Sequence, residues 1–210
     1  NSKGLAGMNW NAKIMPLQVL SDNGNGITYD VVAAIEYAAR QGADVINLSL
    51  ASTTPDAALQ AAVRFAASRN VTVVAAAGNC GNQPPTSCNV LSEPGNMTYP
   101  AIYDEVISVG ALTQSNARAS FSSYGSSLDV MAPGSIVPYS AGWTTSNQTS
   151  LYATGISGTS FSSPIVAGLA ALIRSIDHSL SPKDVRAILI DSSDRVAGMS
   201  NMVWTNQYGY

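Results

Sequence analysis

Two short apolar runs decide the fold of this chain: DVINLSL at residues 44–50 and VTVVAAAGN at residues 71–79. Both are rich in β-branched residues and neither alternates with polar residues, which is typical of strands buried on both faces. Between them, Thr54 and Pro55 begin a helical pattern that extends to about Arg69. A strand, a helix and a strand in this order predict two parallel strands joined by a helical crossover.

The same alternation continues on both sides of this unit. The expected strands are Lys13–Leu20, Val45–Leu50, Val71–Ala77, Val106–Val109 and Leu128–Met131, and the expected helices are Tyr29–Arg40, Thr54–Arg69, Ser160–Ser175 and one that begins at Ser181. Thr28 is the expected cap of the first helix, and Gly42 follows its end. The pattern predicts one α/β domain over residues 1–210, with helices on both faces of a mostly parallel sheet.

Composition excludes several classes of protein. The chain has 210 residues with 46% hydrophobic and only 11% charged residues, enough for a substantial core. A formal net charge of −3 and no cluster of basic residues argue against nucleic acid as a partner. The longest apolar run, Ile165–Ile173, is too short to span a bilayer, so we expect no membrane partner. A dinucleotide-binding domain is disfavoured because no Gly-x-Gly-x-x-Gly stands between a strand and a helix.

Three loops that leave expected strands or precede a helix carry chemically unusual residues. They are Ser49–Ser52, Ala77–Asn79 and Gly155–Ser160. In open parallel sheets, binding groups collect where strands end at their carboxyl edge. Ser160 begins a long apolar helix, where free backbone N–H groups and the helix dipole favour developing negative charge. That placement suits a nucleophile, and it equally suits a plain helix cap, so the local pattern alone leaves both interpretations open.

A longer motif favours the nucleophile. Residues 158–168, GTSFSSPIVAG, resemble the serine motif of the subtilisin-like serine proteases, the subtilases, except that Ile165 stands where the family commonly has His. The resemblance implies that Ser160 is the catalytic nucleophile and that Asn79, in the AAAGN segment, donates to the oxyanion. Framework segments at residues 99–101, 106–111, 118–125 and 128–134 resemble the family in the same order. It also implies the subtilisin-like three-layer α/β/α fold.

The resemblance also implies where an extended peptide substrate binds. Ser49, Leu50 and Ala51 would pair with the peptide backbone upstream of the scissile bond, as an added strand. The pocket for the residue before that bond would be bounded by Leu50, Ala76, Ala77 and Gly78, a fairly open apolar slot. Thr159, inside the Gly-Thr-Ser motif, completes the expected substrate-binding set. The alternative interpretation of this segment is an ordinary core strand, which holds for Val45, Ile46 and Leu48 in either case.

The Asp and His that a serine protease of this class needs are not found in this sequence. The single His, His178, lies beyond the helix that begins at Ser160, roughly 20 Å or more from it, and hydrogen-bond reach is about 3 Å. Asp22 stands before Asn23-Gly24 but has no His-Gly-Thr after it, so we interpret it as a turn residue. Residues 1–7 resemble the family stretch that follows the His helix. We therefore expect a fragment that an upstream piece with Asp and His completes.

Cys80 and Cys88 flank a loop-like segment. A zinc site would need carboxylate ligands because the chain has one His, so a loop disulfide and an oxidising, secreted or extracellular location are favoured. No cofactor is expected to be required and no metal ligand is assigned. Family loops near Tyr99–Val106 and Asp129 can hold a calcium ion, which makes a structural calcium an open prediction, although residues 80–97 depart from the common pattern.

Two functions from different classes follow from the sequence. The first is a secreted serine endopeptidase that hydrolyses peptide bonds through an acyl-enzyme on Ser160 when the upstream segment completes it, with this chain alone inactive. The second is a pseudoprotease that binds extended peptides without cleaving them. Covalent labelling of the serine distinguishes the two.

Overall fold

The computed structural model describes residues 7–82, 95, 97–135, 140–141, 152–153 and 155–210. The helices are α1 (Thr28–Arg40), α2 (Ala57–Ser68), α4 (Thr159–Ile176) and α5 (Pro182–Asp191), with a short 3-10 helix η1 (Ala197–Met199). The strands are β1 (Val45–Leu48), β2 (Thr72–Ala76), β3 (Val106–Leu112), β4 (Val130–Pro133), β5 (Ser140–Ala141) and β6 (Tyr152–Ala153). The first four form a parallel sheet in the order β1-β2-β3-β4, and β5 and β6 form an antiparallel pair.

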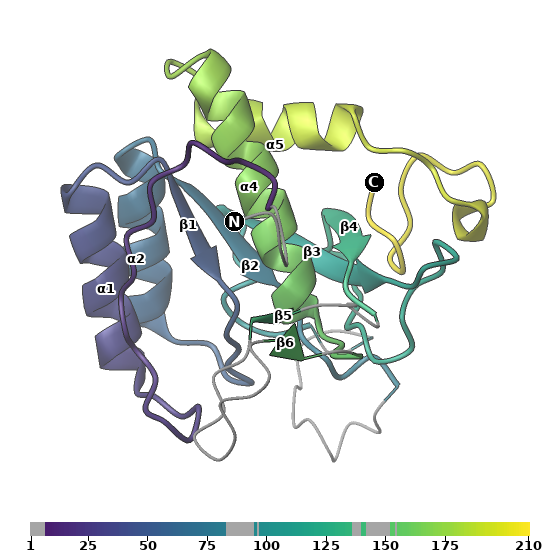
Figure 1. The fold of residues 1–210 in the computed structure, drawn as a ribbon, viewed down its shortest axis with the longest axis horizontal. Helices are drawn as coiled ribbons and strands as arrows, with labels where there is room; N and C mark the ends of the chain where they lie inside the picture. Colours follow the sequence, from purple (N-terminus) through teal and green to yellow (C-terminus); the bar gives the residue numbers. More distant parts are fainter. Residues whose placement is uncertain (1–6, 83–94, 96, 136–139, 142–151, 154) are drawn as a thin grey trace.

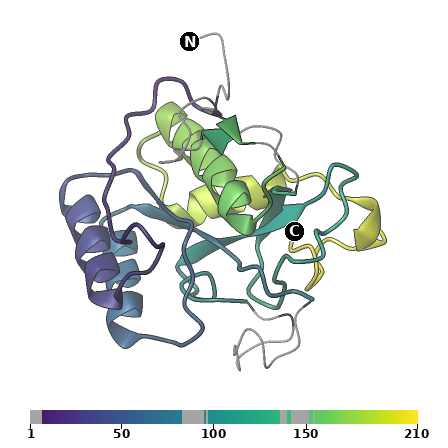
Figure 2. The same ribbon diagram turned by 60° about the horizontal axis from the view of Figure 1, so that its bottom comes forward.

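The parallel sheet is the middle of three layers. Helices α1 and α2 cover one face, and α4 and α5 lie on the other (Figures 1 and 2). Strand β2 shows the division directly, because Val73 and Ala75 belong to the cluster on the α1 and α2 side whereas Val74 belongs to the α4 and α5 side. This arrangement confirms the expected three-layer α/β/α fold. It also explains why β2 has no polar face.

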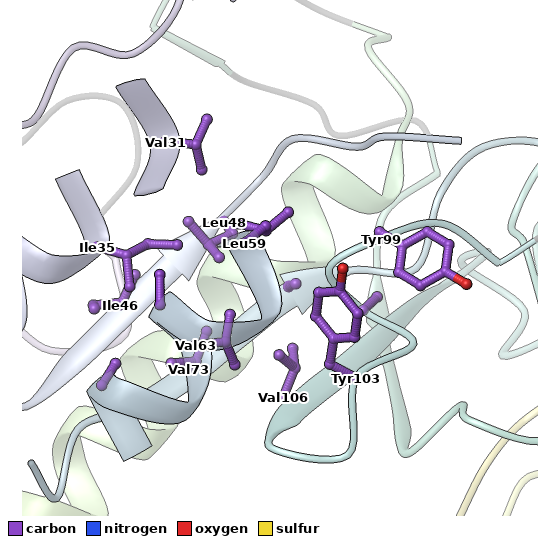
Figure 3. Close-up of a cluster of buried hydrophobic side chains, with 14 of the residues drawn as sticks. Val31, Ile35, Ile46, Leu48, Leu59, Val63, Val73, Tyr99, Tyr103 and Val106 are labelled. Atoms are coloured by element: carbon purple, nitrogen blue, oxygen red, sulfur yellow. The ribbon is translucent and has the colours of Figure 1, made fainter. Parts of the chain in front are cut away.

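The helices form because their apolar residues recur at helical spacing. On α1, Val31, Ile35 and Ala38 are buried on one face, and Leu59 and Val63 do the same on α2. These side chains meet Ile46, Val73 and Val106 of the sheet in the core cluster shown in Figure 3. Figure 3 also shows Tyr99 and Tyr103 at the end of that cluster, with ring centroids 5.1 Å apart.

Element boundaries depart from the sequence expectations in three places. Thr28 does not cap α1 but is its first residue, because the cap position is Ile27, which makes no side-chain capping bond. Helix α2 begins at Ala57 rather than at Thr54, because the Asp56 side chain accepts a hydrogen bond from the Leu59 N–H and so defines the start. The strands shift by one to three residues at one or both ends, by one at each end of β2 and by three at the end of β3.

The expected strand at Lys13–Leu20 is wrong. These residues form neither helix nor strand, and most of their apolar side chains are exposed. Within the part of the chain that the structure describes, no neighbouring strand is present for them to pair with. Since strands are stabilised by pairing and not by propensity alone, a β-rich run without a neighbour stays unpaired.

Helix α4 is, among the described helices, the one whose length and apolar composition would allow it to cross a membrane. It packs across β1, β2, β3 and β4, and Figure 1 shows it lying over the middle of the sheet. Its buried side chains include Val166, Ala167 and Ala170. Its apolar character is therefore accounted for by its place in the core.

The register of the sheet sets the location of the site. Leu48 of β1 lies beside Ala75 of β2, so both strands end at the same edge. The loops that follow, Ser49–Ser52 and Ala77–Asn79, therefore leave the sheet next to each other. The first turn of α4 meets them there, as the contacts described next show.

Candidate active site

Ser160 lies in the first turn of α4, at the carboxyl edge of β1 and β2. Helix α4 begins at Thr159, so Ser160 is its second residue, and its side chain is half-buried. The Ser160 Oγ donates to the backbone carbonyl of Ser49 over 3.5 Å. The Ser160 backbone N–H belongs to the first turn, whose N–H groups have no carbonyl partner four residues back within the helix. A hydroxyl and a backbone donor therefore stand together at the positive end of a helix.

Asn79 is held against the same helix start by its amide oxygen. The Asn79 Oδ1 accepts from the Thr159 backbone N–H at 2.9 Å and from the Thr159 Oγ1 at 3.0 Å. Thr159 is fully buried, and its Oγ1 also accepts from the Gly78 N–H at 3.3 Å. Because both contacts use the oxygen of the amide, the Nδ2 is left as the donor. That nitrogen lies beside Gly158, 3.7 Å from the position that a Cβ would occupy there.

The turn that carries Asn79 is fixed from the other side by buried residues. Gly78 has a φ of +110°, and a Cβ on it would lie 2.8–2.9 Å from Thr98 and Ser123. The Ser123 N–H donates to the Gly78 carbonyl at 2.9 Å, and the Ser123 Oγ accepts from the Cys80 N–H at 3.1 Å. The backbone on both sides of Asn79 is thus held by Ser123. Only glycine fits position 78 without moving these groups.

The expected substrate-binding residues fall into exposed and buried groups. Ser49 and Ala51 are exposed and Leu50 is half-buried, so this segment is open to a partner on its outer side. Ser52, which follows, already pairs with Tyr99 through hydrogen bonds of 2.8 and 2.9 Å. The remaining expected residues, Ala76, Ala77 and Gly78, are buried under this segment. The apolar slot that they were expected to bound stays a prediction.

Asp129 does not fit a cation site. Arg186 donates to its Oδ1 from both Nε, at 2.9 Å, and Nη2, and the Ser108 N–H donates to its Oδ2 at 2.9 Å. Burial raises the pKa of the Asp129 carboxyl, and Arg186 and Ser108 act against that rise. Both carboxylate oxygens thus have donors, and a positive charge lies beside them. Across the described parts of the chain, no group of three or more His, Cys, Asp or Glu residues could hold a metal ion.

His178 is not brought to Ser160. It follows the far end of α4, an 18-residue helix, which is about 27 Å long at 1.5 Å per residue. Its imidazole is 75% exposed and its Nδ1 lies 3.9 Å from the Asp44 Oδ1. Asp22 lies in an exposed turn. Among the described residues, Asn79 thus meets the first turn of α4 that carries Ser160, whereas His178 lies beyond the other end of that helix.

Sequence reasoning missed several residues that shape the site. Asn47 and Ser163 connect β1 to α4 through a hydrogen bond of 2.7 Å, and Thr98 and Ser123 hold the turn at Gly78. The one local signal for Asn47 was a polar side chain in the middle of an apolar strand. Cys88 lies outside the described residues, so its expected pairing with Cys80 stays a prediction.

The fold is that of a three-layer α/β/α protein with a serine in the first turn of a core helix, and comparison with known proteins identifies its family. The family model described as "Subtilase family" matches residues 1–210. This chain belongs to the subtilase family.

Known relatives extend beyond the chain. It is 41% identical over 198 residues to thermitase of Thermoactinomyces vulgaris, covering 94% of this chain and 63% of that protein. It is 38% identical over 209 residues to M-protease of Shouchella clausii (strain KSM-K16), covering 100% of this chain and 48% of that protein. A solved protease structure from Pseudoalteromonas arctica PAMC 21717 superposes with a TM-score of 0.77 and 30% identity, over 93% of this chain and 60% of that one. The chain thus spans about half to two thirds of these relatives.

Proposed function

We propose that this chain is the nucleophile-bearing part of a secreted serine endopeptidase. The observation that carries the proposal is the joint placement of Ser160 and Asn79 at the start of α4, with the amide oxygen of Asn79 occupied by Thr159 and its Nδ2 left to donate. Family membership supports the same activity. The disulfide expected between Cys80 and Cys88 fits an extracellular location.

The chemistry is acyl transfer. The Ser160 Oγ attacks the carbonyl carbon of the scissile peptide bond, and the proton of the hydroxyl passes to a His that an upstream segment supplies together with its Asp. The negative charge that develops on the carbonyl oxygen is stabilised by the Asn79 Nδ2 and the Ser160 backbone N–H. The amine leaves with the proton, and water then releases the acyl group from Ser160.

The substrate is an extended peptide or protein segment. The exposed backbone of Ser49–Ala51 pairs with it, and the residue before the scissile bond enters the region bounded by Leu50, Ala76, Ala77 and Gly78. Thr159 is fully buried and contributes by orienting Asn79 through its backbone N–H and its Oγ1, rather than by contact with the substrate. No cofactor enters the reaction, and a structural calcium, if one binds, would use groups other than the Asp129 carboxylate.

A peptide-binding pseudoprotease is the second candidate. The observation that favours it is the distance of the single His from Ser160, because without a base the hydroxyl remains a weak nucleophile. In that case Ser49–Ala51 would still bind an extended peptide.

Labelling with a fluorophosphonate probe tests the proposal. We expect Ser160 to be labelled when this chain is joined to, or mixed with, a segment that carries the Asp and His, and not in the chain alone. The Ser160→Ala variant is the control for labelling at another residue. Absence of labelling in both forms would overturn the endopeptidase and favour the pseudoprotease. Intact mass of the purified protein, with a search for a co-purifying peptide, tests the two-piece version.

A further inference from the structure

A proline in α4 leaves the nucleophile's own carbonyl without its helical partner. In an α-helix the carbonyl of residue 160 accepts from the N–H of residue 164, but Pro164 has no N–H and its ring crowds that carbonyl. The missing donor comes from another element. The Ser49 Oγ donates to the Ser160 carbonyl at 3.0 Å.

The Ser49 hydroxyl is in turn oriented by Asn47. The Asn47 Nδ2 donates to the Ser49 Oγ at 3.0 Å, and the Asn47 Oδ1 accepts from the Ser163 Oγ at 2.7 Å. Ser163 is fully buried, so its hydroxyl proton has this acceptor instead of water. Its hydroxyl fixes which end of the Asn47 amide faces Ser49. With the amide N–H pointing at the Ser49 oxygen, the Ser49 proton is free to go to Ser160.

These bonds form a closed connection between strand β1 and helix α4. It runs from Ser163 through Asn47 and Ser49 to the carbonyl of Ser160, three residues before Ser163 on the same helix. Ser49 meets the nucleophile a second time, because its own carbonyl accepts from the Ser160 Oγ. The position of the nucleophile is therefore tied to the segment that we propose to bind substrate.

We propose that Asn47 is a positioning residue of the protease: it orients Ser49, which holds the carbonyl that Pro164 leaves free and so sets the direction of the Ser160 hydroxyl. The proposal rests on the proposed function, because the reaction that it serves is attack by Ser160. Asn47 touches neither substrate nor reacting atoms and acts only through Ser49. Its effect therefore belongs to the rate of the chemical step more than to substrate binding.

The variant Asn47→Asp isolates the donor half of the amide. The introduced carboxylate still accepts from Ser163 but cannot donate to Ser49, so the Ser49 hydroxyl turns toward that carboxylate and releases the Ser160 carbonyl. In the complete protease, with the Asp and His segment present, we expect kcat to fall about tenfold and KM to stay within about twofold. An unchanged kcat would overturn the proposal.

Two neighbouring serines separate positioning from simple stability. Ser163→Ala removes the contact to Asn47, whereas Ser162→Ala removes an equally buried hydroxyl that donates instead to the Ala132 carbonyl on β4 at 3.0 Å. We expect both to lower the unfolding midpoint and only Ser163→Ala to lower kcat, by about tenfold. If the two variants lose kcat equally, Asn47 has a structural role only.

Pro164 supplies a second, sharper test. In Pro164→Ala the helix regains an N–H for the Ser160 carbonyl, and residue 164 is exposed enough to change without disturbing the core. We expect Asn47→Asp to cost less than about threefold in kcat in that background. A full tenfold loss there would show that the effect does not pass through the carbonyl.

The hydrogen bond between Ser49 and the Ser160 carbonyl can also be examined by a method that does not depend on enzymatic activity. If the unaltered complete protease is not labelled by a fluorophosphonate, the proposed function has failed, and crystal structures then decide the role of Asn47. Loss of the contact between the Ser49 Oγ and the Ser160 carbonyl in Asn47→Ala would support positioning. Survival of that contact would overturn it.

Discussion

Two regions of the molecule differ in how well their side chains are accommodated: one is held by hydrogen bonds, and the other leaves apolar side chains exposed to solvent. In the nucleophile region, which comprises residues 47–52, 77–80 and 158–163, hydrogen bonds join side chains far apart in the sequence, as between Asn79 and Thr159. In the N-terminal segment, residues 8–20, large apolar side chains lie in solvent, with Trp10 82% and Ile14 83% exposed. The first region is preorganised by the chain itself, and the second resembles an interface without its partner.

The edge of the sheet shows the same difference. Strand β1 pairs with β2 on one side, and on its other side no strand pairs with it among the described residues. An open strand edge is a place where another strand can add. Under the proposed function, this chain would supply attack and oxyanion stabilisation, and the proposed upstream segment would supply the base and cover the open surface.

The largest effect is expected from the donor in the nucleophile region. Asn79→Ala in the complete protease should lower kcat by about 10²–10³ with little change in KM, a magnitude that comes from the corresponding donor in subtilisin, a member of the same family. Asn79→Asp should lose at least as much, because its oxygens keep the two contacts from Thr159 but no N–H remains. Steady-state kinetics with a peptide substrate measures both. A rise in KM at constant kcat would contradict the oxyanion role.

The next effect tests how rigidly the nucleophile region is built. Gly78→Ala and Gly42→Ala both place a side chain at positive φ, +110° and +79°, but only the first meets other atoms within 4 Å. We expect Gly78→Ala to lower the free energy of unfolding by about 2–4 kcal/mol and Gly42→Ala by about 1 kcal/mol. Denaturant unfolding of the two variants gives the difference. Equal losses would mean that Thr98 and Ser123 yield to the added methyl group.

A third, smaller effect addresses the N-terminal segment. Ile14→Asp should weaken binding of the segment that carries the Asp and His by about ten- to a hundredfold, because burial of one aliphatic side chain is lost. The unfolding free energy of the chain alone should change by less than about 0.5 kcal/mol, since the side chain is 83% exposed. Titration calorimetry with the segment measures the affinity. The matched control is Ile176→Asp, which changes a side chain that is 87% exposed at the end of α4.

The result for Ile14→Asp would decide whether the N-terminal segment is an interface. Equal affinities for Ile14→Asp and Ile176→Asp would show that the N-terminal segment is not part of the interface. The open edge of β1 would then need another explanation.

Local signals in the sequence were enough for the elements that are stabilised locally. Ser181-Pro182 predicted the start of α5, because the cap and its partner Asp184 are neighbours in the chain. The Lys13–Leu20 strand failed for the opposite reason, since its β propensity is local but the pairing that would stabilise it is not. Asp56, one residue after Pro55, decided the start of α2 through a single side-chain contact.

The site divides in the same way. Resemblance to the family pointed to Ser160 and Asn79 as candidates, but it could not show that Thr159 holds the oxygen of the Asn79 amide. The contact between Asn47 and Ser163 joins residues 116 positions apart, and no spacing in the sequence encodes it. Such partners are set by the crossing of β1 and α4, which is a property of the folded core.

The smallest expected effect concerns the capping box at the start of α5, which lies outside both regions. Asp184 completes a capping box with Ser181 at the start of α5, and the Ser181 hydroxyl, followed by its N–H, lowers the pKa of the Asp184 carboxyl. A carboxyl with a lowered pKa in the folded state stabilises the protein above its unfolded pKa, and this is lost as the pH falls through the folded value. Asp184→Asn should therefore be less stable than the parent chain at pH 7 and equally stable at pH 2, by thermal unfolding.

The control for this variant is Asp191→Asn at the other end of the same helix. A negative charge is unfavourable at a helix C-terminus, so its removal should leave stability at pH 7 unchanged or slightly higher. Neither variant should alter labelling of Ser160 or binding of the upstream segment, because Asp184 and Asp191 lie on α5, which belongs to neither region. If the stability of Asp184→Asn changed with pH in the same way as that of the parent chain from pH 2 to pH 7, the charge of Asp184 would contribute nothing to stability.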